Sequence, residues 1–531
     1  MSEAEPGSRT LEVRDFDPQL FTRITRALAD AFPVSVEAVA ERRVFFDTFD
    51  WSVHGRGLSL VDVKGGDRTL QLGPAGCAPV AVWEGAGRVM LAADLPVGYF
   101  QDTLAGVIGI RALLPRIVVD SRGERCAIAN EEGKTVVEVC SLTHTVGRPN
   151  WASTRAATKG RRARGPAILR IVPVAGHAKA LKRVVRIISD ICERPSASLP
   201  EPACYAEAIG LVPGGYSSKL ALSLDADLCT VDAVQAILEN LLETFEANEE
   251  GTLLDLDIEF LHDFRVASRR CRSLISALKK WLPPVPFARL NRELKWLGEL
   301  TGPVRDADVF ALELADLGLT SVSGAPQVAL EQYLMAEHDK ARAKLARALR
   351  TERYQRVKEL WRRLVDDSSL YAKCPAADSR VIDVATARIS KVFQRVIRQC
   401  ASLDETTPAE LVHELRIDAK KLRYLLEFFR SLYPSDDVEA FIANLKKLQD
   451  ELGDFNDLDV QQDTLQGHAG AMFDKGIGTP ELFLELGRAT ERLAQRQVGV
   501  RKRVNGACKA FATKSSRKAF RRVLAQAGTT K

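Results

Sequence analysis

The chain has 531 residues, of which 46% are hydrophobic, and its formal net charge at pH 7 is only +5. This length predicts more than one domain, and the apolar fraction is ordinary for a protein that buries a core. No apolar run reaches the length of a membrane span, and the ten cysteines form neither a C-x-x-C pair nor a zinc-type cluster. We therefore expect a soluble cytoplasmic protein without a membrane partner, a metal or another cofactor.

The basic residues are unevenly distributed. Three clusters stand out: Arg161-Arg162-x-Arg164, Arg501-Lys502-Arg503 and Arg517-Lys518-x-x-Arg521-Arg522. Because the whole chain is nearly balanced in charge, such local clusters indicate a specific anionic partner rather than general adhesion to anions.

Residues 8–195 are predicted to form a first domain made mostly of strands. Aromatic and β-branched runs occur at 44–48, 58–63, 69–72, 116–119, 125–129, 135–139 and 167–174, with a turn expected at Gly65-Gly66. Residues 20–32 and 178–191 have the periodicity of amphipathic helices. Successive strands with few helices predict an antiparallel β-barrel or sheet.

One stretch of this domain resembles a known family. Arg43-Val-Phe-Phe46-Asp47-Thr48-x-Asp50, followed by Gly57-Leu58-x-Leu60, is similar to the corresponding segment of CYTH domains, the triphosphate tunnel proteins. The resemblance implies a Glu-x-Glu-x-Lys strand whose carboxylates hold a divalent metal. Here that strand reads Thr10-Leu-Glu12-Val-Arg14, so one of the two glutamates is missing.

The later strands depart further from the CYTH pattern. Where the family has a second run of alternating glutamates, this chain has Ile168–Pro173, in which Arg170 is the one charged residue. The strand at 58–63 also lacks the arginines that the family uses for phosphate. Because hard divalent metals need several oxygen ligands, we expect a degenerate, inactive CYTH-like domain.

Residues 196–224 are rich in Pro, Ser and Gly and are interpreted as a linker. From 225 to 531 the periodicity is helical, with helices expected near 231–248, 256–282, 287–300, 325–349 and 354–364 and again at 381–400, 408–432, 438–452, 481–511 and 516–524. The chain is thus predicted to be an α+β protein with two domains.

The helical half contains one segment written twice. His262-Asp-Phe-Arg265-Val-Ala-Ser-Arg269-Arg270-Cys-Arg272 matches His413-Glu-Leu-Arg416-Ile-Asp-Ala-Lys420-Lys421-Leu-Arg423. The match continues without a gap through Gly302 and Gly453 to Asp306-x-Asp308 and Asp457-x-Asp459. It indicates an internal duplication, with repeat 1 at about 225–368 and repeat 2 at about 376–531.

The spacing of the repeated residues predicts a basic stripe on each helix. The first, second, third and last basic positions lie at i, i+3, i+7 and i+10, which share one helix face over roughly 15 Å. Like charges on one face repel each other, so two matched stripes favour an anionic ligand over a merely solvated surface.

The duplicated H-x-x-R-x-x-x-[RK]-[RK]-x-R pattern, followed each time by G-x-x-x-D-x-D, resembles the conserved-histidine α-helical domain (CHAD). The resemblance covers roughly residues 220–531. It implies two pseudo-symmetric four-helix bundles that face each other across a basic groove. It also implies binding of inorganic polyphosphate and location at polyphosphate granules with their associated proteins.

The resemblance and the repeat together give the candidate binding residues, and no catalytic residue is expected. The duplicated Lys295 and Lys446 are candidates for the groove wall. The polyphosphate-binding residues are predicted to be His262, Arg265, Arg269, Arg270, Arg272, Lys295, His413, Arg416, Lys420, Lys421, Arg423 and Lys446. The paired aspartates after each stripe are interpreted as structural, capping a helix or holding basic side chains.

Two other functions remain open. A metal-dependent triphosphatase could act through the first domain, although the missing carboxylates disfavour it. The basic stripes could bind nucleic acid, since their charge suits DNA or RNA. The helical half lacks aromatic residues interleaved with its basic residues, which binders of single strands use for stacking, so nucleic acid is the less favoured ligand. The chain length bound and the oligomeric state are left undetermined by the sequence.

Overall fold

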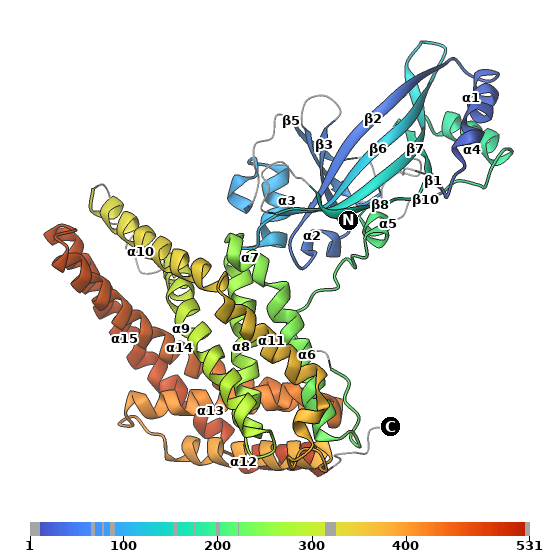
Figure 1. The fold of residues 1–531 in the computed structure, drawn as a ribbon. Helices are drawn as coiled ribbons and strands as arrows, with labels where there is room; N and C mark the ends of the chain where they lie inside the picture. Colours follow the sequence, from blue (N-terminus) through green and yellow to red (C-terminus); the bar gives the residue numbers. More distant parts are fainter. Residues whose placement is uncertain are drawn as a thin grey trace. The chain divides into compact units, whose positions relative to one another are not determined.

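The computed structural model of the chain describes residues 11–64, 69–76, 79–84, 91–151, 158–174, 176–197, 202–220, 222–313 and 325–525. The chain divides into two compact units, residues 1–217 and 218–531, which are described separately below (Figure 1). The turn expected at Gly65-Gly66 and the first residue of the strand expected at 10–14 lie outside the described residues.

Unit 1 is built on one antiparallel sheet, as the sequence predicts. Its strands follow the order β10-β1-β9-β7-β6-β2-β3-β4-β5, and β8 pairs with β7. In the described residues the path is open, because the edge strands β10 and β5 do not pair with each other. The bounds are β1 (Leu11–Arg14), β2 (Val34–Asp47), β3 (Leu58–Lys64), β4 (Thr69–Pro74), β5 (Ala81–Glu84), β6 (Leu114–Ala129), β7 (Thr135–Pro149), β8 (Thr158–Arg164), β9 (Ile168–Pro173) and β10 (Ser196–Ala197).

The central strands are longer than the sequence pattern suggests. The two short strands expected at 116–119 and 125–129 are parts of the single strand β6, which continues through Gly123. The residues between them are polar or glycine even on the side where Ser121 is buried, which weakens the alternation that identifies a strand. Backbone pairing with β2 and β7 nevertheless holds the segment in the sheet.

Gly123 is the position in β6 where a side chain has no room. A Cβ there would lie 1.8 Å from the backbone carbonyl oxygen of Ser141 on β7. Since backbone cannot rotate away as a side chain can, we expect Gly123→Ala to lower the free energy of unfolding of unit 1 by about 3 kcal/mol or more. Urea denaturation would measure it. Gly106→Ala is the control, because nothing lies within 4 Å of its Cβ, and it should be neutral or stabilising.

Helices cover both faces of the sheet. Helices α1 (Phe21–Ala29) and α4 (Ala178–Ser189) pack against Cys126 and Ile128 of β6. Helix α5 (Ala203–Ala208) packs with Ile117 and Val119, which alternate to the other face. The shorter α2 (Ser52–Gly55) and α3 (Tyr99–Ile108) complete the unit. Tyr205 of α5 is fully buried, so part of the segment interpreted as a linker belongs to this core.

Unit 2 contains the duplicated helices. The first copy has α6 (Thr230–Ala247), α7 (Glu249–Leu254), α8 (Ile258–Leu278), α9 (Pro284–Glu313), α10 (Ala325–Leu349) and α11 (Glu352–Asp366). The second has α12 (Val381–Ser402), α13 (Ala409–Phe428), α14 (Ser435–Asp474), α15 (Pro480–Phe511) and α16 (Lys514–Ala525). The same number of residues separates the first residues of α6 and α12, of α8 and α13, and of α9 and α14, which agrees with the gapless match in sequence.

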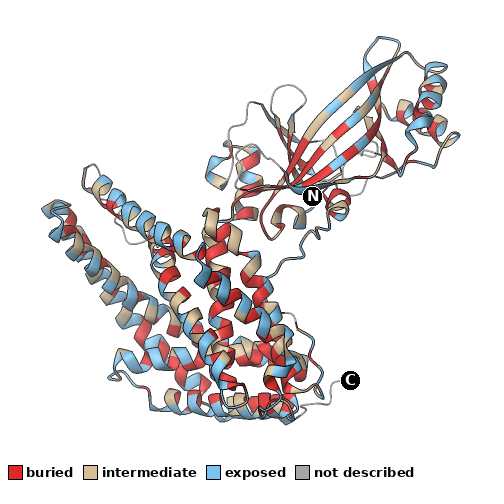
Figure 2. Cartoon of the chain, viewed as in Figure 1, coloured by how far each residue is buried: buried red, intermediate tan, exposed pale blue. Residues whose placement is uncertain are grey.

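Each copy forms a four-helix bundle, as predicted. In the first copy α6, α8, α9 and α11 contact one another in a closed ring, and in the second α12, α13, α14 and α15 do the same. Figure 2 shows buried residues along the bundle helices and mostly exposed residues along α10 and the outer half of α15. Within the described residues, none of the helices combines the length and the apolar character needed to cross a membrane.

The helix ends expected at residues 300 and 452 are absent. Helix α9 runs through Gly302 and Pro303, and α14 runs through Gly453. A proline inside a helix removes one backbone hydrogen bond, but burial of the flanking Leu300 and Val304 keeps α9 continuous. The aspartates that follow therefore lie within the helices and do not cap new ones, so the capping role proposed for them is wrong.

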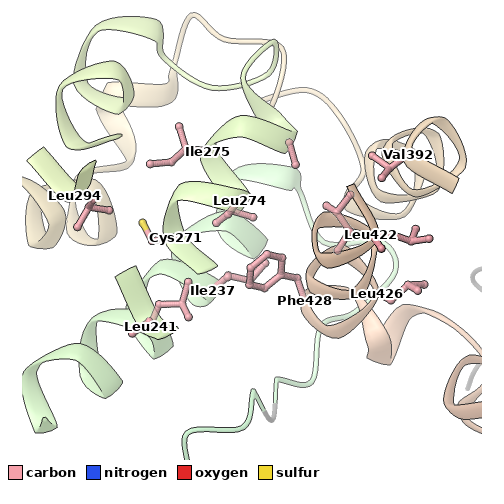
Figure 3. Close-up of a cluster of buried hydrophobic side chains, with 14 of the residues drawn as sticks. Ile237, Leu241, Cys271, Leu274, Ile275, Leu294, Val392, Leu422, Leu426 and Phe428 are labelled. Carbon is pink, nitrogen blue, oxygen red and sulfur yellow. The ribbon is translucent and has the colours of Figure 1, made fainter. Parts of the chain in front are cut away.

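The two bundles share one hydrophobic core. A single cluster of buried side chains extends from Leu224 to Val523 through both copies. Figure 3 shows Ile237 and Leu274 from the first copy together with Leu422 and Phe428 from the second. Because α8 and α13 contact each other within this core, their remaining faces converge on one side of it.

Candidate anion-binding site

Helix α8 places its basic stripe by burying the opposite side. Asp257 caps its N-terminus by accepting hydrogen bonds from the backbone N–H groups of Glu259 (2.9 Å) and Phe260 (3.2 Å). Phe264 and Leu274 are buried in the core, together with other apolar residues at helical spacing. The positions between them, which carry the stripe, are left to face the second copy.

The two stripes meet at a cavity of about 630 Å³ between α8 and α9 on one side and α13 and α14 on the other. Six basic side chains line it, three from each copy, against two carboxylates. The lining residues are Arg265, Arg269, Arg272, Ser273, Ser276, Asn291, Asp306, Arg416, Ile417, Lys420, Lys421, Tyr424, Asn456, Asp457 and Val460. The duplication therefore produces a single site to which both copies contribute.

Arg269 and Lys420 occupy equivalent positions in the two stripes, and both line the cavity. Within the described residues neither forms a hydrogen bond or an ion pair. Burial lowers the pKa of Lys420 to about 8, and the neighbouring charges of Arg416 and Arg269 add to this effect. The centre of the cavity thus holds positive charge that the protein itself does not neutralise.

Arg265 and Arg416 form the second equivalent pair. Nη1 of Arg265 donates to Oγ1 of Thr301 (2.8 Å) and to the carbonyl oxygen of Gly298 (3.3 Å). Nη2 of Arg416 lies 3.3 Å from Oδ1 of Asp457. In both arginines Nε is buried and has no hydrogen-bond partner in the described structure. Each guanidinium is therefore anchored at one end and retains an unused donor.

The carboxylates of the cavity do not cancel its charge. Burial lowers the pKa of Arg265 to about 10, with a further contribution from Arg269. Burial also raises the pKa of Asp306, although the nearby Arg265 opposes that shift. Like charges crowd together here at a cost in free energy, which a bound anion would offset.

The comparisons with known proteins agree with this architecture. The family model for the CHAD domain matches residues 236–466. The helical unit contains a CHAD domain. Two uncharacterized proteins of Mycobacterium tuberculosis, from strains H37Rv and CDC 1551, are each 25% identical to this chain over 283 residues. The match covers 51% of this chain and 54% of each relative, so the chain spans about half the length of the curated relatives it matches.

Solved structures are also similar to the CHAD domain described here. The crystal structure of the CHAD domain from the plant Ricinus communis is 28% identical, with a TM-score of 0.47, and covers 55% of this chain and 95% of its own. PptA from Streptomyces chartreusis is 15% identical, with a TM-score of 0.43, and covers 53% of this chain and 100% of its own.

Glu427 breaks the symmetry between the two copies of the CHAD domain. Its carboxylate accepts from Nη2 of Arg270 (3.0 Å) and from Nε of Arg423 (2.7 Å). Nη1 of Arg270 also donates to the carbonyl oxygen of Ser218 (2.6 Å). In the first copy the position equivalent to Glu427 is Ser276, which lines the cavity. Neither Arg270 nor Arg423 is among the lining residues, although the sequence places both in the site.

Arg270 therefore has the geometry of a structural residue. Removing one partner of a buried ion pair leaves the other charge poorly compensated. Here Arg423 still pairs with Glu427 after the substitution, so the cost is smaller than for the loss of every partner. We expect Arg270→Ala to lower the free energy of unfolding by roughly 2–3 kcal/mol, measured by urea denaturation. Lys280→Ala, which removes an exposed charge beside the same helix, is the control. Unchanged stability with a loss of anion affinity would instead return Arg270 to the site.

Four other predicted residues also lie outside the cavity lining of the CHAD domain. His413 is exposed, and its Nδ1 lies 2.6 Å from Oδ1 of Asn456, which does line the cavity. His262 is half-buried. Lys295 is exposed, with Nζ 3.8 Å from Oε1 of Glu299, and Lys446 is exposed on α14.

 Of the twelve predicted residues, the cavity lining contains Arg265, Arg269, Arg272, Arg416, Lys420 and Lys421, and it does not contain the other six.

Sequence reasoning missed the polar, uncharged part of the lining. Asn291 accepts from Nε of Arg272 (3.4 Å), and Asn456 precedes Asp457 on α14. Neither is repeated in the other copy, where the equivalent residues are Ile442 and Arg305. A search for residues shared by both copies therefore cannot find them. The position of Asn456 directly before the repeated Asp457 could have suggested this one.

The repeated aspartates of the CHAD domain hold basic side chains, which is one of the two structural roles proposed for them. Asp457 pairs with Arg416 at the cavity. Asp308 is buried and lies 2.9 Å from Nε2 of His338 on α10, and this contact raises the pKa of His338. These contacts tie α13 to α14 and α9 to α10 within their own copies.

The face of the sheet that α5 covers carries a separate polar network. Glu12 is buried, and its Oε1 lies 3.3 Å from Nε of Arg170. The hydroxyl of Tyr205 accepts from Arg43 (2.8 Å) and from Arg170 (3.2 Å). Within the described residues, no group of three or more His, Cys, Asp or Glu side chains is placed to hold a metal ion.

Proposed function

We propose that the CHAD domain binds inorganic polyphosphate in the cavity between α8 and α13, without a chemical step. The observation that carries this proposal is the convergence of Arg269 and Lys420, from two copies of one sequence, on a cavity where neither has a counter-ion in the described structure. A linear polyanion without bases supplies the missing charge along the part of both stripes that lines the cavity.

The chemistry of the side chains supports a phosphate ligand. Charge-assisted hydrogen bonds to phosphate oxygens are short and strong, and the planar guanidinium of arginine can form two of them in parallel. Arg265 and Arg416, whose buried Nε groups have no hydrogen-bond partner in the described structure, supply two of these guanidinium groups. Lys420 and Lys421 act as point charges. Association with polyphosphate granules and their proteins is part of the same proposal.

Nucleic acid is the competing ligand for the same charges. Binders of single strands stack successive bases on aromatic side chains, and Tyr424 is the one aromatic residue among those that line the cavity. A single ring cannot form a platform for successive bases. This favours polyphosphate over DNA or RNA at equal charge.

The deciding experiment is a binding titration of the full chain with long-chain polyphosphate at several salt concentrations. Single-stranded DNA at equal phosphate concentration serves as the competitor. We expect tight binding that weakens with salt and that DNA does not displace. Easy displacement by DNA would reduce the site to a general anion surface.

The triphosphatase alternative is tested in the same samples. Phosphate release from tripolyphosphate is measured with Mg²⁺ or Mn²⁺ present, and we expect no release above the level of a buffer control. Steady release would support an active first domain, and the ion pair between Glu12 and Arg170 would then need to open to admit a metal.

A further inference from the structure

One row of side chains crosses five strands of the sheet in unit 1, on the face that α1 and α4 cover farther along β6 at Cys126 and Ile128. The part of this face that carries the row is called the open face, because Lys64 and Arg122 are exposed there. The register pairs Lys64 with Arg42, Arg42 with Asp120, Asp120 with Thr145, and Thr145 with Arg164. Directly paired residues of an antiparallel sheet project from the same face. Three cations from β3, β2 and β8 therefore stand in one line.

This row borders a cavity of about 550 Å³ on the sheet. Four basic residues from four different strands line it, together with the hydroxyl groups of Thr143 and Thr145 and the carboxylate of Asp120. Glu41 and Ser121 also border the cavity, but they are paired with each other and their side chains alternate to the opposite face. The lining residues are Ala40, Glu41, Arg42, Lys64, Asp120, Ser121, Arg122, Thr143, Thr145 and Arg162. Arg162 and Arg164 belong to a basic cluster that the CHAD domain does not explain.

The carboxylates in this cavity are already engaged. Asp120 forms ion pairs with both Arg42 (3.8 Å) and Arg162, and Glu41 lies 3.0 Å from Nε of Arg43. Asp120 thereby holds two guanidinium groups at the cavity. Its single negative charge offsets only one of the two guanidinium charges, so the site keeps a net positive charge.

Two cations remain without a counter-ion. Lys64 and Arg122 are exposed and form no ion pair within the described residues. Lys64 stands directly opposite Arg42, and like charges in that arrangement destabilise a sheet. An anion in the cavity would remove this repulsion. The proposal for the CHAD cavity rests on the same effect, but the residues of the two cavities are unrelated.

The hydroxyl groups add neutral donors and acceptors. Thr143 and Thr145 lie two residues apart on β7, so both side chains project from the face that carries Arg122. Oγ1 of Thr143 already donates to the carbonyl oxygen of Arg122 (3.0 Å), so Thr145 is the hydroxyl group that can donate to a phosphate oxygen. Hydroxyl groups among guanidinium groups are suited to the oxygens of a phosphate.

The other face of the sheet is unsuited to this role. Arg43, which alternates with Arg42, is buried on that face and donates to Tyr205. The Glu12 and Arg170 pair occupies the same side. An anion that approaches the sheet therefore meets the open face, away from the strand positions that the CYTH resemblance assigns to metal and phosphate.

We propose that the open face of the sheet is a second phosphate site, which binds short linear inorganic polyphosphate through Arg42, Lys64, Arg122 and Arg162. This site does not depend on the proposed function of the CHAD domain. Lys64 and Arg122 supply the uncompensated charge, while Arg42 and Arg162 supply guanidinium donors held in place by Asp120.

The test uses the full chain with Arg269→Ala and Lys420→Ala as the starting variant, which removes the central charges of the CHAD cavity. Binding of short-chain polyphosphate is measured by isothermal titration calorimetry. We expect the starting variant to retain one binding event, and addition of Lys64→Ala and Arg122→Ala to weaken it at least tenfold. Arg23→Ala with Lys179→Ala, which removes the same charge from α1 and α4, should leave it unchanged.

Hydrogen–deuterium exchange of the wild-type chain locates the ligand without a substitution. We expect short-chain polyphosphate to slow exchange in β2, β6 and β7 around the cavity. The proposal is overturned if the starting variant no longer binds, if the two pairs of substitutions act alike, or if single-stranded DNA displaces the ligand at equal phosphate concentration. Failure of the CHAD proposal would appear separately, as equal long-chain binding by the starting variant and the wild type.

Discussion

Replacing both Arg269 and Lys420 by alanine is expected to weaken polyphosphate binding by about 100-fold or more. A hydrogen bond to a charged group contributes roughly 1.5–3 kcal/mol, and loss of two such bonds multiplies the dissociation constant accordingly. The two side chains have no counter-ion in the described structure, so alanine at these positions should also relieve repulsion and leave the fold intact.

A salt titration of the double variant separates direct contact from a general loss of charge. Each phosphate contact contributes nearly one to the slope of log affinity against log salt, so the slope should become shallower by about two. The matched control is Lys280→Ala with Arg398→Ala, which removes one lysine and one arginine from exposed positions outside the cavity. If both double variants lose the same affinity, the cavity is not the binding site.

The second large effect is a fall in affinity as the pH rises from 7 to 9. The pKa of Lys420 in the free protein is lowered to about 8, chiefly by burial, so most molecules lose this charge above that pH. Bound phosphate favours the charged form, so binding takes up a proton where free Lys420 is neutral. We expect about a tenfold weakening at pH 9 relative to pH 7.

Lys420→Arg provides the control for this pH dependence. Arginine stays charged throughout the range, and the equivalent residue in the first copy is Arg269. The variant should bind with nearly constant affinity between pH 7 and 9. A wild-type profile that is equally flat would mean that Lys420 does not contact the ligand.

The same group has an opposite influence on folding. Because folding lowers the pKa of Lys420 from its ordinary value of 10.5 to about 8, the unfolded chain binds more protons between these two values. The contribution of Lys420 to the free energy of unfolding therefore rises with pH across that window. Stability and affinity should move in opposite directions, which distinguishes a local charge effect from loss of structure.

The helical half could be predicted well because its signals are local and are repeated. Periodicity placed the stripe helices within a few residues of their observed bounds, and the spacing of Arg265 and Arg269 was sufficient to place them on one face. The continuity of α9 could not be predicted, because Gly302 and Pro303 break helices in isolation. The burial of Leu300 and Val304, which opposes that tendency, depends on tertiary packing.

Six of the twelve candidate binding residues lie outside the cavity lining, and the sequence does not distinguish them from the six that line it. Arg270 follows Arg269 directly, yet Arg270 lies outside the cavity lining, whereas its equivalent in the second copy, Lys421, lies within it. Glu427 accounts for this difference, because its carboxylate pairs with Arg270 and Arg423. The sequence does not indicate which basic side chains an acidic residue of a helix will pair with.

The shared core of the two bundles has a consequence for synthesis of the chain. The ribosome completes the first copy while roughly 150 residues of the second are still to be made, a delay of about 10–30 s at ordinary rates of elongation. During that time the apolar residues of α6 and α8 that later contact Phe428 have no partner. The nascent first copy is therefore the form of this protein most exposed to aggregation, and it is the form that a chaperone would protect.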